Sequence, residues 1–215
     1  TMQIYYDNLL TEFCSKDELR PGMMEPKTEG SSTYASDTHI FVEIPNHLLS
    51  QTYPGHEKSP DFQMALGPIL FSPRRSTPLL IDKDGLKTFF EKNRTIVEHE
   101  QEECEKCEGE GYIECKCCHH ENECSECDGE GIVNGLPTGR RLIPGRVKVK
   151  LGKGYFAAHL LEIIVNASAD QPLYFVNKPD ALKAALFQFG EIHCGQMPVL
   201  TDGEDDSLCF VHPTN

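Results

Sequence analysis

The N-terminal part of the chain shows three kinds of hydrophobic and polar pattern. Apolar residues recur at helical spacing over 8–20 (NLLTEFCSKDELR), which predicts a helix. The stretch 31–45 (SSTYASDTHIFVEIP) predicts two short strands, of which 39–44 is the clearer. Residues 50–78 are rich in proline and serine and predict a long loop or an insertion.

A strand and then a helix are predicted over 78–93 (PLLIDKDGLKTFFEKN), with Asp82 or Asp84 as the N-cap. The C-terminal part is the most regular. It predicts, in order, a strand, a helix and three strands at 147–151, 154–167, 172–176, 184–190 and 192–200. Because a helix on an antiparallel sheet buries this pattern most readily, the predicted fold class is α+β, with helices packed on an antiparallel sheet.

The length of 215 residues and the 39% hydrophobic content permit one sizeable core and a small accessory module. The accessory module is predicted where cysteines and acidic residues concentrate. The expected organisation is an N-terminal part of the α+β body, an inserted small hairpin module, a C-terminal βαβββ part and an acidic tail, at 1–97, 98–135, 136–200 and 201–215.

Seven of the ten cysteines lie between Cys104 and Cys127, and an eight-residue phrase, CxxCxGxG, occurs there twice. It reads CEKCEGEG over 104–111 and CSECDGEG over 124–131. A CxxC turn holds two thiolates close enough to share an ion, and two such turns complete a four-thiolate zinc site. The glycines suit a chain that reverses direction directly behind each cysteine pair.

These repeats resemble the cysteine-rich zinc-binding module of DnaJ-type co-chaperones, and the resemblance covers 104–131. It implies that Cys104, Cys107, Cys124 and Cys127 share one zinc ion. The family usually carries four motifs and two zinc ions, whereas this chain has two complete motifs and one CxxC without its glycines.

Between the repeats lies the sequence ECKCCHH, which offers further metal donors. A second zinc site built from some of these residues is one interpretation, and a solvated turn with spare donors is the other; the residues are Cys115, Cys117, Cys118, His119 and His120. A disulfide framework is the alternative for the whole cysteine cluster. The scattered positions of the other cysteines favour a reduced compartment, and we expect the protein to be cytoplasmic.

Charge is distributed very unevenly along the chain. Thirteen acidic residues and two lysines between Glu98 and Gly131 give this segment −11 of the total formal charge of −14. DNA affinity comes chiefly from cations that displace phosphate counterions, so this segment is unsuited to nucleic acid. The expected partner is a basic protein surface, and the alternative is that the acidic residues only solubilise an exposed module.

The residues that follow the second repeat are basic, with no aspartate or glutamate between Gly131 and Glu162. Cations alternate with apolar residues in RVKVKL over 146–151, which predicts a half-buried strand with one cationic face. That face is either a phosphate contact or the solvent side of an edge strand protected by lysines. The candidate nucleic-acid contacts are Arg140, Arg141, Arg146, Lys148 and Lys150.

A second resemblance involves the regions on either side of the module. SKDELRPGM (15–23) followed by TYASDTHIFVEI (33–44) is similar to the helix and strand pair of a bacterial DNA sliding-clamp domain, and QMPVL (196–200) to the way such domains end. The resemblance implies clamp-like βαβββ units with the module inserted. The helix predicted at 8–20 contains three acidic and two basic residues, so it does not offer a phosphate-facing surface.

These features favour a protein that is not an enzyme. Four cysteines close the coordination sphere of a zinc ion, and the glycine tails lack the lysine and the strand-to-helix context of a phosphate-binding loop. No apolar run approaches the ~20 residues of a membrane span.

The leading hypothesis is a zinc-binding protein-interaction module on an α+β scaffold. One alternative is a DNA-replication or mobile-element accessory protein that binds DNA through 140–153. Another is a chaperone-type adaptor that binds unfolded clients.

Overall fold

The chain forms two units in the computed structural model, which describes every residue except 1, 73, 116, 178–182, 200–207 and 210–215. The body unit comprises Thr1–Asn93 and Pro144–Asn215, and the finger unit comprises Arg94–Ile143. The predicted module, 98–135, lies inside the finger unit. The finger unit is therefore an insertion in the sequence of the body unit.

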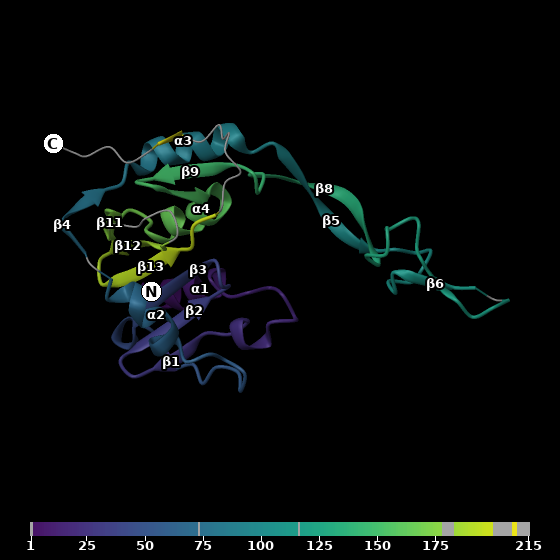
Figure 1. Cartoon of the computed structure of the whole chain (residues 1–215), viewed down its shortest axis with the longest axis horizontal. Coiled ribbons are helices and arrows are strands. Elements are labelled where there is room, and N and C mark those ends of the chain that lie inside the picture. The colour runs from purple at the N-terminus through teal and green to yellow at the C-terminus, as the bar shows by residue number, and fades with distance from the viewer. Residues whose placement is uncertain (1, 73, 116, 178–182, 200–207, 210–215) are drawn as a thin grey trace. The chain divides into compact units, whose positions relative to one another are not determined.

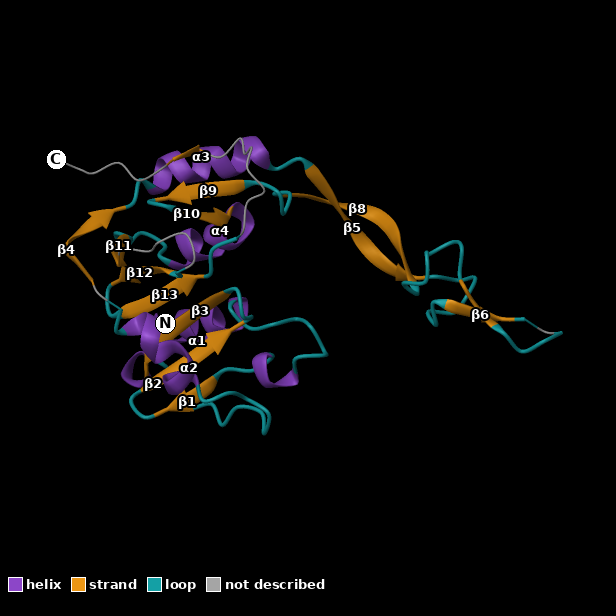
Figure 2. Ribbon diagram, in the orientation of Figure 1, coloured by secondary structure: helices purple, strands orange, loops and turns teal. Residues whose placement is uncertain are grey.

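An antiparallel sheet of seven strands forms the centre of the body unit (Figures 1 and 2). From one edge to the other its strands are β1 (Lys27–Glu29), β2 (Ser32–Ser36), β3 (Ile40–Pro45), β13 (Ile192–Gln196), β12 (Ala185–Phe189), β11 (Tyr174–Asn177) and β4 (Arg74–Leu80). Successive residues of β3 and β12 are buried, so both faces of the sheet are covered at its centre. The fold is α+β with helices packed on an antiparallel sheet, as predicted.

In the described part of the chain, four α-helices and two short 3₁₀ helices accompany the sheet. They are α1 (Met2–Glu12), η1 (Pro21–Met23), η2 (Asn46–Leu48), α2 (Phe62–Leu70), α3 (Lys83–Asn93) and α4 (Ala158–Ala167). Helix α1 contacts β2, helix α4 contacts β13, and α3 packs against α4. The body unit therefore has its core between the sheet and these helices.

Helix α1 corrects the predicted helix over 8–20, because it spans Met2–Glu12 and residues 13–20 form turns. The Ser15 hydroxyl accepts a hydrogen bond from the Asp17 amide (3.1 Å), and the Asp17 carboxylate accepts one from the Leu19 amide (3.0 Å). Side chains that bond to nearby amides offer the backbone an alternative to the helix. The apolar spacing therefore continues beyond the point at which these side chains end the helix.

Helix α2 corrects the prediction of a loop throughout 50–78. The Asp61 side chain accepts a hydrogen bond from the Met64 amide (2.8 Å) and so caps the N-terminus of the helix. Phe62, Leu66 and Leu70, one helical turn apart, are buried against a core cluster contributed by four strands of the sheet. Burial of this apolar face stabilises a short helix in a segment otherwise rich in proline and serine.

A second sheet of three strands has β9 (Lys148–Leu151) at its centre, antiparallel to β10 (Gly154–Ala157) and parallel to β14 (Leu208–Cys209). The interpretation of β9 as an edge strand is therefore wrong. The helix predicted over 154–167 is shorter, since Gly152, at φ +63°, turns the chain and residues 154–157 pair with β9. The predicted tail, 201–215, lies outside the described residues except for β14.

Helix α3 begins as predicted, because the Asp82 carboxylate accepts a hydrogen bond from the Gly85 amide (2.9 Å). Next to this cap, the Lys83 ammonium group extends to the C-terminal end of α4. It donates to the Ser168 hydroxyl (3.1 Å) and to the carbonyls of Ala169 and Gln171 (2.6 Å each). These carbonyls belong to the turn that follows α4, so Lys83 connects this turn to α3 and places a cation near the negative end of the α4 dipole.

Replacing Lys83 with methionine is expected to lower the free energy of unfolding of the body unit by about 1–3 kcal/mol, because charge-assisted hydrogen bonds are lost. Lys87→Met, on the exposed side of the same helix, is the control and is expected to change stability by less than about 0.5 kcal/mol. Urea unfolding followed by circular dichroism measures both. Equal losses of stability in the two variants would show that the hydrogen bonds of Lys83 do not stabilise the body unit.

Candidate metal centre

The finger unit contains two antiparallel ladders, and the ligands predicted for the first zinc ion lie where they meet. Strand β5 (Ile96–Glu103) pairs with β8 (Ile132–Leu142), and β6 (Tyr112–Glu114) pairs with β7 (Glu121–Glu123). The glycines and prolines of 134–145 (NGLPTGRRLIPG) predict an exit linker, but these residues are in β8 as far as Leu142. The predicted linker is wrong there because β5 supplies ladder partners, with an irregular register where His99 faces Pro137.

Almost nothing in the finger unit is buried except the candidate ligands. Among its described residues, those buried are Cys104, Cys107, Gly111, Cys124, Cys127, Gly131 and Ile143. Two half-buried apolar side chains, Ile113 and Val133, pack against the cysteine cluster. The described part of the unit therefore has no apolar core of its own. Its buried centre is the cluster of four cysteine sulfurs.

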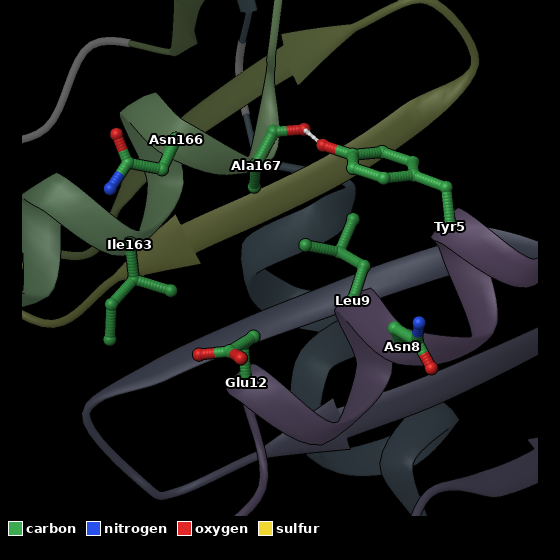
Figure 3. Close-up of a pocket in the computed structure, with 7 residues that line it drawn as sticks. All are labelled: Tyr5, Asn8, Leu9, Glu12, Ile163, Asn166 and Ala167. Carbon is green, nitrogen blue, oxygen red and sulfur yellow. Dashed lines mark hydrogen bonds between the residues drawn. The ribbon is translucent and has the colours of Figure 1, made fainter.

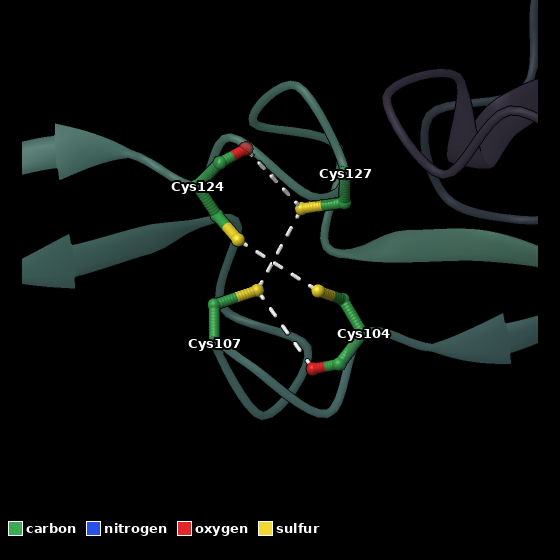
Figure 4. Close-up of side chains that lie close together, drawn as sticks. All are labelled: Cys104, Cys107, Cys124 and Cys127. Atoms are coloured by element: carbon green, nitrogen blue, oxygen red, sulfur yellow. Dashed lines mark hydrogen bonds between the residues drawn. The ribbon is translucent and has the colours of Figure 1, made fainter.

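The four cysteine side chains of the two repeats point toward one another from the two CxxC turns (Figure 4). All four sulfur atoms lie within 4.8 Å of each other. The Cys104 and Cys124 sulfurs are 3.7 Å apart, and so are those of Cys107 and Cys127. A tetrahedral site with Zn–S bonds of about 2.3 Å has sulfur–sulfur edges of about 3.8 Å. A disulfide bond is only about 2.05 Å long, so the spacing fits a shared ion rather than the disulfide alternative.

The two repeats are joined by a reciprocal pair of backbone hydrogen bonds. The Cys104 amide donates to the Gly131 carbonyl (2.8 Å), and the Cys124 amide donates to the Gly111 carbonyl (2.8 Å). The last glycine of each repeat therefore holds the first cysteine of the other. Glycine is required at both positions because a Cβ there would meet a backbone carbonyl of the other repeat, that of Gly129 or Gly109.

The same glycines donate their amides to sulfur. Gly111 N–H points at the Cys107 sulfur (3.3 Å) and Gly131 N–H at the Cys127 sulfur (3.2 Å). Both glycines lie in the left-handed region, at φ +81° and +76°, which L-residues with side chains adopt at a cost. Amides aimed at sulfur stabilise thiolates, the form in which cysteine binds metal.

Burial and amide dipoles act in opposite directions on the thiols of this cluster. Burial raises the pKa of Cys104. The backbone amide of Glu126 lowers the pKa of Cys124, because it donates a hydrogen bond to the sulfur. A metal dication at the centre would favour the thiolate at every position and release the remaining protons. Cys104, Cys107, Cys124 and Cys127 therefore have the geometry and the chemistry to hold a zinc ion.

The second predicted site is composed differently in the structure. Cys115, Cys117 and Cys118 bring their sulfur atoms within 4.8 Å of one another, whereas His119 and His120 are not in this group. The His119 Nδ1 instead hydrogen-bonds the Glu114 carboxylate. The structure therefore groups the three sulfurs without either histidine. The CxCC spacing was the available signal that Cys117 belongs with its neighbours.

The predicted basic contacts fall in different units. Arg140 and Arg141 lie in β8 of the finger unit, while Arg146, Lys148 and Lys150 belong to the body unit. The predicted alternation of β9 is confirmed, since Lys148 and Lys150 are half-buried while the apolar residues that alternate with them are fully buried. The Lys150 ammonium group lies 5.4 Å from the centre of the Tyr155 ring. No single strand therefore carries all five cations.

A groove of about 370 Å³ lies between α1 and α4 (Figure 3). Its lining residues are Tyr5, Asn8, Leu9, Glu12, Ile163, Asn166 and Ala167. The Tyr5 hydroxyl closes one end by donating to the Ala167 carbonyl (2.8 Å). None of these residues is a cation, so the groove does not suit a phosphate group.

Comparison with solved structures gives distant neighbours for the chain. These neighbours are bacterial DNA sliding clamps. The clamp from Bartonella birtlesii is 14% identical, with a TM-score of 0.49 over 93% of this chain and 64% of the clamp. A clamp from Pseudomonas aeruginosa is 14% identical, with a TM-score of 0.47 over 94% of this chain and 66% of the clamp. The clamp from C. crescentus has the same identity and TM-score over 94% of this chain and 64% of the clamp.

The chain spans less than two thirds of the length of these clamps. No protein-family model matches the chain, and no curated protein matches it. The resemblance of the repeats to the DnaJ-type module therefore stays a prediction. Among the described residues, no helix is long and apolar enough to cross a membrane.

Proposed function

We propose that the chain is a non-enzymatic zinc-binding protein whose finger unit contacts a protein partner. The observation that supports the zinc centre is the group of four buried sulfurs at the edge lengths of a tetrahedral thiolate site. Four protein ligands leave no open position for a substrate or an activated water, so the ion has a structural role. Zinc is proposed to fold the finger unit and thereby to fix its surface.

The charge of the finger unit indicates the chemistry of the partner. Its segment from Glu98 to Gly131 carries −11, and most of its acidic side chains are exposed. Such a surface repels phosphate backbones and attracts cationic protein surfaces. The proposed partner is therefore a protein that presents clustered lysine and arginine side chains.

A lysine- and arginine-rich peptide is the probe for this proposal. Zinc-loaded protein is expected to bind it at low salt, and Glu121→Gln with Glu123→Gln is expected to weaken binding several-fold. Glu18→Gln with Glu57→Gln, exposed in the body unit, removes the same charge and is expected to leave affinity unchanged. Fluorescence anisotropy measures all three proteins. Equal losses in both double variants, or no binding by the zinc form, would overturn the proposed surface.

A second candidate function rests on the cationic face of β9. Lys148 and Lys150 project on the same side of that strand, and Arg146 precedes Lys148 by two residues. We propose, as the alternative, an accessory protein of DNA replication or of a mobile element that contacts phosphates through this face. A gel shift with duplex DNA at low salt, lost on Lys148→Glu with Lys150→Glu, would support it. Absence of any shift at low salt would eliminate it.

A further inference from the structure

Three cysteines outside the proposed zinc centre gather at the turn between β6 and β7. The sulfur atoms of Cys115, Cys117 and Cys118 lie within 4.8 Å of one another, with those of Cys115 and Cys117 3.0 Å apart. Cys115 is half-buried, and Cys117 and Cys118 are exposed. These sulfurs have no role in the proposed zinc centre.

Backbone hydrogen bonds across the turn hold the group together. The Cys115 amide donates to the His120 carbonyl (2.9 Å), and the His119 amide donates to the Cys115 carbonyl (2.8 Å). His119 lies in the left-handed region at φ +55°, which tightens the reversal of the chain. These backbone hydrogen bonds therefore bring the sulfurs together.

Among the described residues, the donor set has three sulfurs and no fourth ligand. The His119 Nδ1 is committed to Glu114, and the His120 ring is not in the group. A structural zinc ion almost always takes four protein ligands, as the first centre provides. A soft monovalent ion such as Cu(I) is satisfied by two or three thiolates, and thiolate softness selects for it.

Acidic side chains near the turn between β6 and β7 attract cations of any kind. Glu114, Glu121 and Glu123 lie on the two strands that carry it. Their carboxylates are hard oxygen donors that raise the local concentration of cations without selecting copper. Selection therefore depends on the number and softness of the sulfurs.

We propose that Cys115, Cys117 and Cys118 form a second metal site, which binds one soft monovalent cation of the Cu(I) class through three thiolates. The site is exposed, so the ion can be exchanged with a chelator or a partner without unfolding the chain. It is separate from the four-thiolate centre and does not depend on the function proposed for that centre.

The test is an anaerobic titration of the full zinc-loaded chain with Cu(I) in competition with bicinchoninate. Wild-type protein is expected to take up one equivalent of Cu(I) while retaining its zinc. The triple variant Cys115→Ser, Cys117→Ser and Cys118→Ser is expected to lose that equivalent and keep its zinc. Cys14→Ser, which changes a thiol of the body unit, is the control and is expected to behave as wild type.

Three results would overturn the proposal. If the triple variant takes up as much Cu(I) as wild type, the sulfurs at the turn are not the ligands. If zinc is released in step with copper uptake, copper enters the four-thiolate centre instead. If the turn holds a second zinc ion that copper does not displace, the class of ion is wrong. The single variant Cys117→Ser, which leaves two sulfurs, is expected to weaken Cu(I) binding and serves where the triple variant misfolds.

Discussion

Replacing Gly131 with alanine is expected to weaken zinc binding by the finger unit by roughly 100-fold, about 3 kcal/mol. A Cβ at this position would lie 2.1 Å from the Gly109 carbonyl oxygen, a backbone atom of the other repeat. The repeats must separate to admit it. The two reciprocal backbone hydrogen bonds between the repeats would be lost at about 1 kcal/mol each, and the left-handed conformation adds about 1 kcal/mol.

Gly109→Ala is the matched control for this substitution. Gly109 lies in the same type of turn at φ +83°, but its Cβ would approach nothing closer than 3.8 Å. Only the cost of the left-handed conformation, about 1 kcal/mol, applies to this variant. Its zinc affinity is therefore expected to fall by less than about tenfold. Competition with a chromogenic zinc chelator measures both affinities. Equal affinities in the two variants would show that the contact between the repeats is not required.

Removing the metal, or replacing Cys104 with serine, is expected to unfold the finger unit and leave the body unit folded. Zinc binding contributes about 10–16 kcal/mol to the folding of small zinc modules, and this unit has few buried residues besides its cysteines. Hydrogen exchange read by mass spectrometry is the measurement. Protection is expected to disappear from β6, β7 and both CxxC turns and to persist in α3, α4 and β13.

Cys14→Ser is the control for the loss of a thiol elsewhere in the chain. Cys14 lies in the body unit, and its substitution is expected to leave the protection of the finger unit intact. Two outcomes would contradict the account. Protection of the finger unit that survives chelation would show that it folds without metal, and parallel loss in the body unit would show that the two units unfold together.

The gathering of Cys104, Cys107, Cys124 and Cys127 could be predicted from the sequence because the signal is local and repeated. Each CxxC turn fixes the separation of its own two sulfurs. The identical glycine tails then indicate that the two turns are equivalent and face each other. The structure adds the reason for the tails, which is the close approach of Gly111 and Gly131 to the backbone of the other repeat.

The donor set at the turn between β6 and β7 could not be predicted in the same way. Whether His119 or Cys117 joins Cys115 depends on the path of a tight turn, and spacing alone does not determine it. The hydrogen bond between His119 and Glu114 involves residues five apart in the sequence. A list of possible ligands was therefore the limit of what the sequence offered.

The elements that the sequence predicted wrongly depend on strands far away in the sequence. Strand β8 continues through a stretch with two glycines and a proline because β5 lies beside it. Strand β10 replaces the first turn of a predicted helix because β9 offers it a ladder. Tertiary pairing overrides local preference in both cases.

The metal content of the purified chain tests the central claim most directly. Elemental analysis of protein prepared without chelators is expected to find zinc held by the four-thiolate centre, one ion per chain, and to find it absent from the Cys104→Ser variant. Mass spectrometry after alkylation under denaturing conditions with chelator is expected to show these four cysteines as free thiols. A chain that contains no zinc, or that joins these cysteines in disulfides, would contradict the claim that the four sulfurs hold a structural metal.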